Sequence, residues 1–423
     1  MESPATTTTI PEAVFVEIIV RLPLRSIARF KSVSKRWKAL IESSYLRRVF
    51  VSLHKQSSSS SWSLMFGTDY PYPIAEAIGL HGCKTWDLPR SLGSYITPFQ
   101  PHPDPRARVY YISSSNGLIW IDVFVHRTDV ETFPYKTFVG NPVLQQWVEI
   151  PPPPQECKHT ALVTRLDEDG VVSSFKVVRT CDPDESVAPN EWRVYVYSSE
   201  TGLWSFKRLM SSVPVQYTCY YPPVNVDGVI YRWERIVDNS EPGSLLAYDF
   251  FGPEDGDDCC QVIPLPLPYN EDVRRCLTAS GGDVVYIEVL DGILKVWTLN
   301  KNKNGSGGSS SEWWHLSGEE INLVSAVGYD LDCFPMALNP FNADIVYVWS
   351  CQDSCLVSGN LKTQEFIVHQ GSESRWSSGE GCYCAKSYLS SGYIEDNHNI
   401  TSVLMLSQFV LPQWMDPVPR LPN

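Results

Sequence analysis

Residues 10–41 carry three short amphipathic helical patterns, and the long chain that follows reads almost entirely as short strands. Pro11 falls in the first turn of the first pattern, where its missing N–H costs nothing, and Pro23 ends that pattern. Three helices this short cannot enclose all their large side chains alone. Because 43% of the 423 residues are hydrophobic, the rest of the chain can bury a large core. We therefore expect an α+β multidomain chain, with a small three-helix domain followed by a mainly-β domain.

The first helical pattern is apolar on more than one face. Val14, Ile18 and Leu22 recur every four residues, while Phe15 and Ile19 lie off that stripe. One apolar face is expected to close the small domain, and another is expected to meet a partner. The alternative is an ordinary three-helix cap that folds back on the rest of the chain.

The helical segment resembles the F-box, the module by which substrate receptors dock on the Skp-family adaptor of cullin-based ubiquitin ligases. Its most specific match is the run Val-Ser-Lys-Arg-Trp at residues 33–37, in which Ser34 can cap the third helix. Two positions depart from the family pattern, with Ile10 in place of the usual Leu and Ala13 in place of an acidic residue. The resemblance implies a set of adaptor-binding residues: Ile10, Pro11, Val14, Ile18, Leu22, Pro23, Leu24, Ile27, Phe30, Val33, Trp37 and Leu40.

Charge is divided unevenly along the chain. Residues 1–56 hold 10 Lys+Arg against 4 Asp+Glu, while the remainder holds 24 against 44. A basic segment with interleaved aromatic residues could bind nucleic acid, but an acidic body would repel phosphate, so we expect no nucleic-acid partner. A basic surface can also bind an acidic protein, and the family resemblance implies such a partner, because Skp-type adaptors are acidic.

Several classes of function find no support in the sequence. No run approaches the roughly 18 apolar residues of a membrane span, and the N-terminus lacks a signal peptide, so we expect no membrane partner and a location in the nucleus, the cytoplasm or both. Twelve cysteines without an export signal are expected to stay reduced. Pairs such as Cys351/Cys355 lack the spacing of zinc knuckles, and no nucleophile elbow, Walker loop or dinucleotide fingerprint occurs. We therefore expect no metal, no cofactor and no catalysis by this chain.

A near-regular repeat runs through the strand-rich region. A turn residue precedes an apolar run at Gly117, Gly170, Gly228, Asp283 and Asp344, with separations of 53, 58, 55 and 61 residues. A period near 50 is typical of kelch-type β-propellers, and six or seven units would fit, whereas a pair of β-sandwiches is the alternative. With a serine run before it, the expected division is a disordered terminus at 1–9, helices at 10–50, a linker at 51–61 and the β domain at 62–423.

Residues 110–370 resemble the F-box-associated region of plant receptors. The resemblance rests on Ser-Asn-Gly-Leu-Ile at 115–119, Val-Tyr-Val-Tyr-Ser-Ser-Glu-Thr-Gly-Leu-Trp at 194–204 and other runs in the same order. The double glycine of true kelch repeats is mostly missing, so the region looks like a divergent relative. The resemblance implies a substrate receptor that binds the Skp-family adaptor, reaches the cullin scaffold through it and holds an unidentified target protein. Two alternatives are a ubiquitin-independent sequestering module and, with less support, a propeller enzyme.

Tryptophans beside loops are the candidates for contact with a target protein. Propeller loops often expose aromatic anchors, and five tryptophans lie beside loop-like sequence. These candidates are Trp86, Trp313, Trp314, Trp376 and Trp414.

Overall fold

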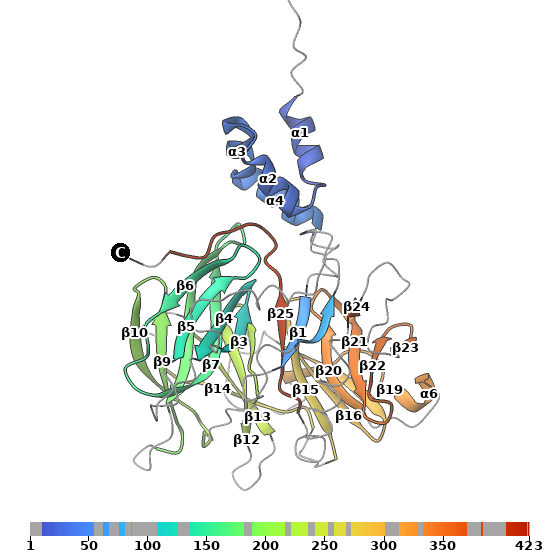
Figure 1. The fold of residues 1–423 in the computed structure, drawn as a ribbon. Coiled ribbons are helices and arrows are strands. Elements are labelled where there is room, and N and C mark those ends of the chain that lie inside the picture. Colours follow the sequence, from blue (N-terminus) through green and yellow to red (C-terminus); the bar gives the residue numbers. More distant parts are fainter. Residues whose placement is uncertain are drawn as a thin grey trace, which may run out of the picture.

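The computed structural model shows a small group of helices standing on a ring of β-sheets (Figure 1). The residues it describes are 11–54, 62–66, 76–80, 86, 108–124, 135–181, 188–215, 221–235, 242–252, 258–267, 272–300, 313–327, 333–369, 382–383, 403–420 and 422. Ile10, Trp376, the N-terminal segment 1–9 and residues 55–61 of the expected linker lie outside this set.

Residues 11–54, which we call the head, contain four helices where three were expected. They are α1 (Glu12–Ile19), α2 (Leu24–Phe30), α3 (Lys35–Ile41) and α4 (Ser44–His54). Ser34 caps α3 as predicted, because its hydroxyl accepts a hydrogen bond of 3.2 Å from the backbone N–H of Trp37. Helix α4 extends regular structure past residue 50, into the stretch expected to be linker.

The strands of the described residues form six sheets, which confirms the propeller expectation. Each sheet has four antiparallel strands, and β19 (Ile321–Asn322) adds a short fifth strand beside β17. In five sheets the strands follow chain order. The first two sheets are β3 (Arg108–Ser115), β4 (Leu118–Phe124), β5 (Tyr135–Asn141) and β6 (Gln146–Ile150), and then β7 (Cys157–Leu166), β8 (Val172–Cys181), β9 (Glu191–Ser198) and β10 (Leu203–Met210). The next three are β11 (Val224–Val226), β12 (Val229–Arg235), β13 (Pro242–Asp249) and β14 (Gln261–Pro264); β15 (Arg274–Ser280), β16 (Asp283–Leu290), β17 (Ile293–Leu299) and β18 (Trp314–Leu316); and β20 (Cys333–Asn339), β21 (Asn342–Ser350), β22 (Cys355–Asn360) and β23 (Phe366–His369).

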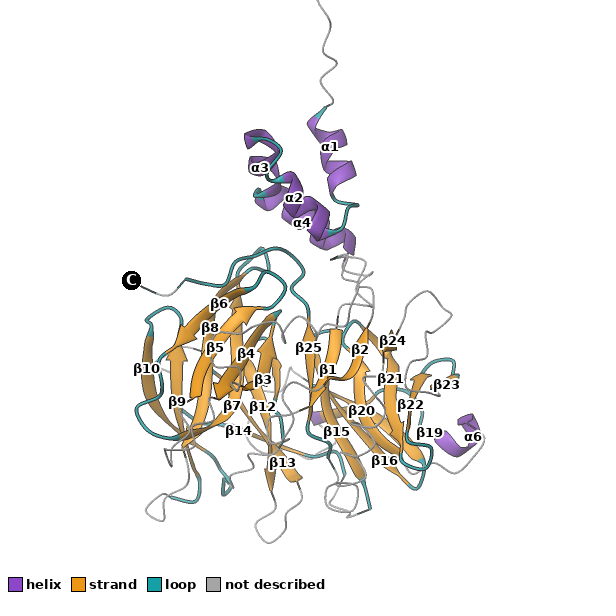
Figure 2. Ribbon diagram, in the orientation of Figure 1, coloured by secondary structure: helices purple, strands orange, loops and turns teal. Residues whose placement is uncertain are grey.

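The sixth sheet closes the ring by joining the two ends of the β region. It contains β1 (Trp62–Phe66), β2 (Glu76–Leu80), β24 (Cys382–Tyr383) and β25 (Leu406–Val410), in the order β24-β2-β1-β25. Strand β25 pairs with β1 over five residues, so a C-terminal strand completes a sheet begun near the head. Apart from the short helix α6 (Leu323–Val327), the helices lie on one side of the ring (Figure 2).

Each pair of neighbouring sheets shares one apolar cluster. In β4, Ile119 and Ile121 face a cluster that includes Phe409, while Trp120 faces another that includes Phe175. Because successive side chains of a strand point to opposite faces, a sheet between two others buries both faces and its strands become continuous apolar runs. This packing explains why apolar runs, rather than alternation, marked the strands in the sequence.

The repeat seen in the sequence is the repeat of the sheets. Gly117, Gly170 and Gly228 lie in the turns between the first two strands of their sheets, Asp283 begins β16, and Asp344 lies near the start of β21. At Gly117, φ is +81°, and an added Cβ would lie 2.5 Å from the backbone nitrogen of Pro412. Glycine is needed there because the C-terminal segment crosses directly over the turn.

Candidate functional site

The head has its own apolar core, and this core is continuous with the apolar contact between the head and the sheets. Val16 and Ile19 of α1 are buried with Leu24 and Ile27 of α2 and with Ile41 of α3. Five apolar side chains removed from water at this scale contribute on the order of 10 kcal/mol to burial free energy before conformational entropy opposes it. The inward face of α1 is therefore occupied without any second protein.

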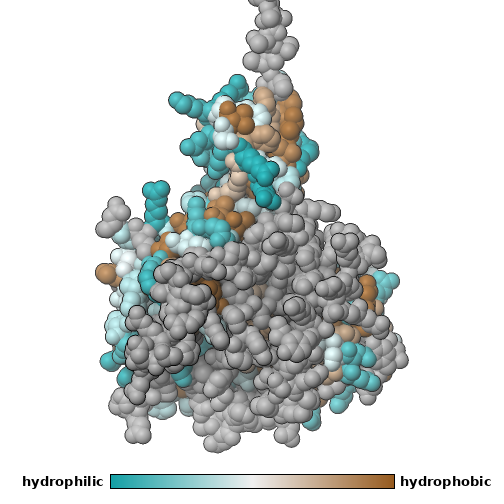
Figure 3. Space-filling model, viewed as in Figure 1, coloured by the Kyte–Doolittle hydropathy of each residue, from teal (hydrophilic) through white to brown (hydrophobic). Residues whose placement is uncertain are grey.

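The outward face of the head leaves apolar side chains in solvent. The exposed fractions are 44% for Val14, 52% for Ile18 and 61% for Val33. Trp37 is half-buried between two rings, with centroid distances of 5.3 Å to Phe15 and 5.0 Å to Phe30. Figure 3 shows apolar surface on the head, well away from the sheets. Helix α1 is thus apolar on two faces, as its sequence predicted, and one of them is uncovered.

The predicted adaptor-binding residues divide into three groups by burial. Pro11, Val14, Ile18 and Val33 are exposed, whereas Leu24 and Ile27 are fully buried. The remaining members are half-buried around the exposed residues: Leu22, Pro23, Phe30, Trp37 and Leu40. The resemblance alone does not distinguish exposed from buried members of the motif. Leu24 and Ile27 point into the head, because they are the buried apolar residues that α2 contributes to its core. These two residues support the surface and do not form it.

Basic side chains surround the exposed apolar residues. Arg21 pairs with Glu17 at 2.6 Å, and Arg36 pairs with Glu12 at 3.4 Å, with all four side chains more than half exposed. Four further cations of α2 and α3 are also exposed: Arg25, Arg29, Lys35 and Lys38. Exposed pairs add little stability, so the main effect of this charge is a positive field around the apolar surface.

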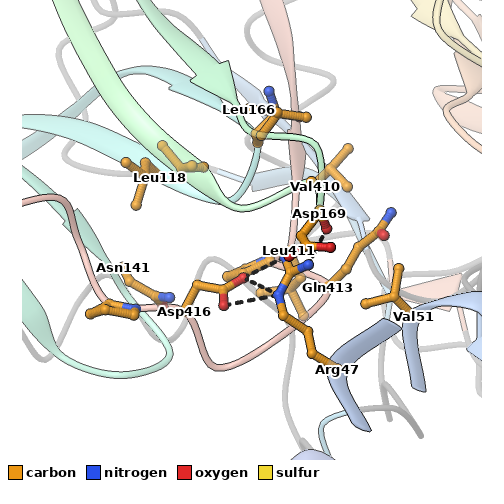
Figure 4. A pocket seen from close by; sticks show the side chains of 15 residues that line it. Arg47, Val51, Leu118, Asn141, Leu166, Asp169, Val410, Leu411, Gln413 and Asp416 are labelled. Carbon is orange, nitrogen blue, oxygen red and sulfur yellow. Dashed lines mark hydrogen bonds and ion pairs between the residues drawn. The ribbon is translucent and has the colours of Figure 1, made fainter. Parts of the chain in front are cut away.

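Helix α4 fixes the head to the ring. The buried Arg47 reaches the carboxylate of Asp416 on the C-terminal segment, with 2.8 Å between Nη2 and Oδ2, and also donates to the carbonyl of Asp169 in the β7–β8 turn. Phe50 packs on Trp414 with centroids 4.9 Å apart. Arg47, Asp169 and Asp416 line a small cavity of about 160 Å³, and Figure 4 shows the guanidinium of Arg47 bonded directly to the carboxylate of Asp416. Sequence reasoning missed this junction because its members lie 369 residues apart.

The tryptophan candidates for target binding are interior residues. Trp86, Trp313, Trp314 and Trp414 are all at most 5% exposed. The indole N–H of Trp86 donates to the carbonyl of Pro412 at 2.8 Å, and that of Trp314 donates to the carbonyl of Pro264 at 2.7 Å. The prediction of exposed anchors at these four positions was wrong, because large rings beside loops fill the gaps between sheets.

Exposed apolar side chains occur instead on the outer strand β10. Leu203, Phe206 and Met210 are each at least 40% exposed. In each sheet the outer strand is the one at the end away from the ring's centre. Strand β10 has eight residues, whereas the corresponding strands β6, β14, β18, β23 and β24 have five or fewer. The sequence of 203–210 holds five apolar residues around the adjacent pair Lys207 and Arg208, but it does not show that this strand lies at the edge of its sheet.

Metal sites and membrane-spanning helices are not found among the described residues. In the described part of the chain, no group of three or more His, Cys, Asp or Glu side chains is placed to hold a metal ion. The helices described there are all too short or too polar to cross a membrane.

Comparison with known proteins agrees with both parts of this structure. A model of the F-box domain matches residues 8–49, and a model described as F-box protein At3g26010-like, beta-propeller, matches residues 60–420. Among curated relatives from Arabidopsis thaliana, F-box protein At1g49990 is 53% identical over 442 residues, covering 98% of each chain. F-box protein At3g26010 is 40% identical, covering 100% of this chain and 94% of its own, and a third relative, At4g22430, is named as an F-box/kelch-repeat protein.

A helical F-box joined to a ring of six sheets defines an F-box protein with a β-propeller. This chain belongs to the plant F-box proteins whose C-terminal region is an At3g26010-like β-propeller.

Proposed function

We propose that this protein is the substrate-recognition subunit of a Skp–cullin–F-box ubiquitin ligase. The F-box domain implies binding to a Skp-family adaptor in general, and the adaptor would join the protein to the cullin scaffold. The propeller would hold a target protein for ubiquitination and degradation, in the nucleus, the cytoplasm or both. The protein itself would do no bond chemistry, because holding a target near a ubiquitin-charged enzyme raises the effective concentration of its lysines.

The observation that carries this proposal is the uncovered apolar surface formed by Val14, Ile18 and Val33. It lies on a head whose core is already closed by other residues and whose α4 is already held by the propeller. The fold therefore gives these side chains no intramolecular partner among the described residues, and an amphipathic helix presented in this way suits a groove on a second protein. The surrounding cations favour an acidic partner.

The sharpest test changes the exposed face of α1 without touching the core. We expect the double variant Val14→Asp, Ile18→Asp to weaken binding to a Skp-family adaptor by roughly 30-fold or more in Kd, since losing one interface anchor commonly costs about 2 kcal/mol. Isothermal titration of the full-length chain measures this change. These positions are better suited than Leu22 and Pro23, which are half-buried in the head.

A control places a single aspartate at an exposed apolar position on the propeller. Ile367→Asp alters a side chain that is also more than half exposed, but on β23, and should leave the affinity unchanged. Equal binding by the double variant and the wild type would refute adaptor docking through α1. A wild-type chain that fails to bind the adaptor would favour the ubiquitin-independent sequestering module.

A further inference from the structure

The open end of the β7–β8 hairpin carries two cysteines that face each other. Cys157 begins β7, Cys181 ends β8, and the strand register pairs them directly. Both are thiols, with their sulfur atoms 3.8 Å apart. No metal-ligand spacing or family motif drew attention to this pair, because the two residues are 24 positions apart.

The backbone already has the geometry that a disulfide requires. Residues directly opposite in an antiparallel pair have Cα atoms about 4.5 or 5.5 Å apart, and disulfides bridge Cα separations of about 4.4–6.8 Å. The S–S bond is about 2.05 Å long, so the sulfurs of Cys157 and Cys181 must approach by less than about 2 Å. Side-chain rotation can supply that movement while the strand register is kept.

Both cysteines are buried, so a small reagent reaches them only when the end of the hairpin opens. Cys157 and Cys181 are 6% and 5% exposed, and the neighbours Glu156 and Lys158 are exposed. Because the pair closes the last rung of the hairpin, opening that rung alone would present the thiols. Ends of strands open at a much lower free energy than the centre of a sheet.

We propose that Cys157 and Cys181 are a reversible disulfide-forming site that exchanges with small disulfides such as glutathione disulfide. The thiolate of one cysteine attacks a sulfur of glutathione disulfide, forms a mixed disulfide and releases one glutathione thiolate. The second cysteine then attacks the protein sulfur of that mixed disulfide and releases the other glutathione. The two thiol protons pass to the two glutathione thiolates, so the protein dithiol is oxidised by two electrons and one glutathione disulfide is reduced to two glutathiones.

The site lies on the hairpin that also contacts the head. At the opposite end of this hairpin, Asp169 offers its carbonyl to Arg47 and its carboxylate to Arg48, with 3.4 Å between Arg48 Nε and Asp169 Oδ1. A disulfide at the open end would close a 24-residue span and restrict fraying of the element that receives α4. Oxidation therefore stabilises the hairpin on which the head rests.

The test is a redox titration of the folded, full-length chain. The protein is equilibrated in glutathione buffers of increasing oxidised fraction, quenched with acid, alkylated with iodoacetamide and digested for peptide mass spectrometry. We expect a peptide linked through Cys157 and Cys181, reversed by reduced glutathione. Because two glutathiones are released, the ratio of linked to reduced protein should fall with the square of the reduced glutathione concentration.

Single substitutions separate this site from general cysteine oxidation. Cys157→Ser and Cys181→Ser should each abolish the linked peptide and leave the partner as a mixed disulfide, whereas Cys355→Ser should leave the link intact. The wild-type titration tests the disulfide between Cys157 and Cys181 even if a variant folds poorly. Mixed disulfides without a link, thiols that stay unreacted in the folded chain, or a link that forms only in denaturant would each overturn the proposal.

Discussion

Two adjacent arginines of α4 show how burial decides the value of an ion pair. Arg47 is buried and bonds Asp416, whereas the side chain of Arg48 is 62% exposed beside Asp169. Removing one partner of a buried pair leaves an uncompensated charge, so Arg47→Ala should lower the free energy of unfolding by about 2–4 kcal/mol. Arg48→Ala should lower it by less than about 1 kcal/mol. Urea unfolding followed by tryptophan fluorescence compares them, and equal losses would contradict this account of the junction.

A single histidine should make stability depend on pH. His369, at the end of β23, lies 2.7 Å from the hydroxyl of Ser358, and burial lowers its pKa from 6.5 to about 3. The unfolded chain therefore binds a proton between these two pH values that the folded chain does not. The stability from neutral His369 is complete above pH 6.5 and is lost as the pH falls toward 3. His369→Gln should flatten the slope of unfolding free energy against pH in this window, while parallel slopes would show that His369 protonates freely in the fold.

At the scale of elements, the strands could be predicted because their chemistry is local. In five sheets, a turn residue followed by an apolar run marks the start of the second strand, and the anchors from Gly117 to Asp344 all lie at or near that point. Helix α4 could not be predicted in this way. Residues 51–54 were expected to be linker, but Leu46 and Phe50 lie four residues apart on the buried face of α4, and Phe50 is covered by Trp414 from the far end of the chain. Contacts with distant segments decided that element.

The candidate site was predicted in part, for a related reason. Helical spacing identified Val14 and Ile18 as one stripe, and the structure leaves that stripe exposed. Spacing could not show that Leu24 and Ile27 point inward, or that Trp414 packs on Phe50, because both depend on how elements meet. A tryptophan that lies beside a loop in the sequence can still be buried in the fold, as Trp414 is.

At the scale of the whole molecule, the C-terminal strand closes the ring. From β25, the side-chain amide of Gln408 donates to the carbonyl of Leu338 at 2.8 Å and accepts from the backbone N–H of Ala279 at 3.1 Å. Its own carbonyl accepts from the hydroxyl of Ser114 at 2.9 Å. One residue thus joins the closing sheet to three others, through bonds that are all partly buried and therefore costly to lose.

Truncation tests this closure. A chain ending at Ser402 should lose cooperative thermal unfolding and aggregate, because β1 keeps β2 but loses β25, and two sheet faces lose their cover. A chain ending at Arg420 keeps β25 and should unfold like the full-length protein. Calorimetry distinguishes the two, and a chain ending at Ser402 that unfolds at the wild-type temperature would show that the ring does not depend on β25.

We propose that the head offers the exposed face of α1 to an adaptor while its α4 is held by the propeller. Hydrogen–deuterium exchange of the full-length chain, with and without a Skp-family adaptor, tests it most directly. The account predicts new protection in peptides from α1 to α3 and unchanged exchange in the six sheets. Protection on the propeller with an unprotected α1 would contradict it.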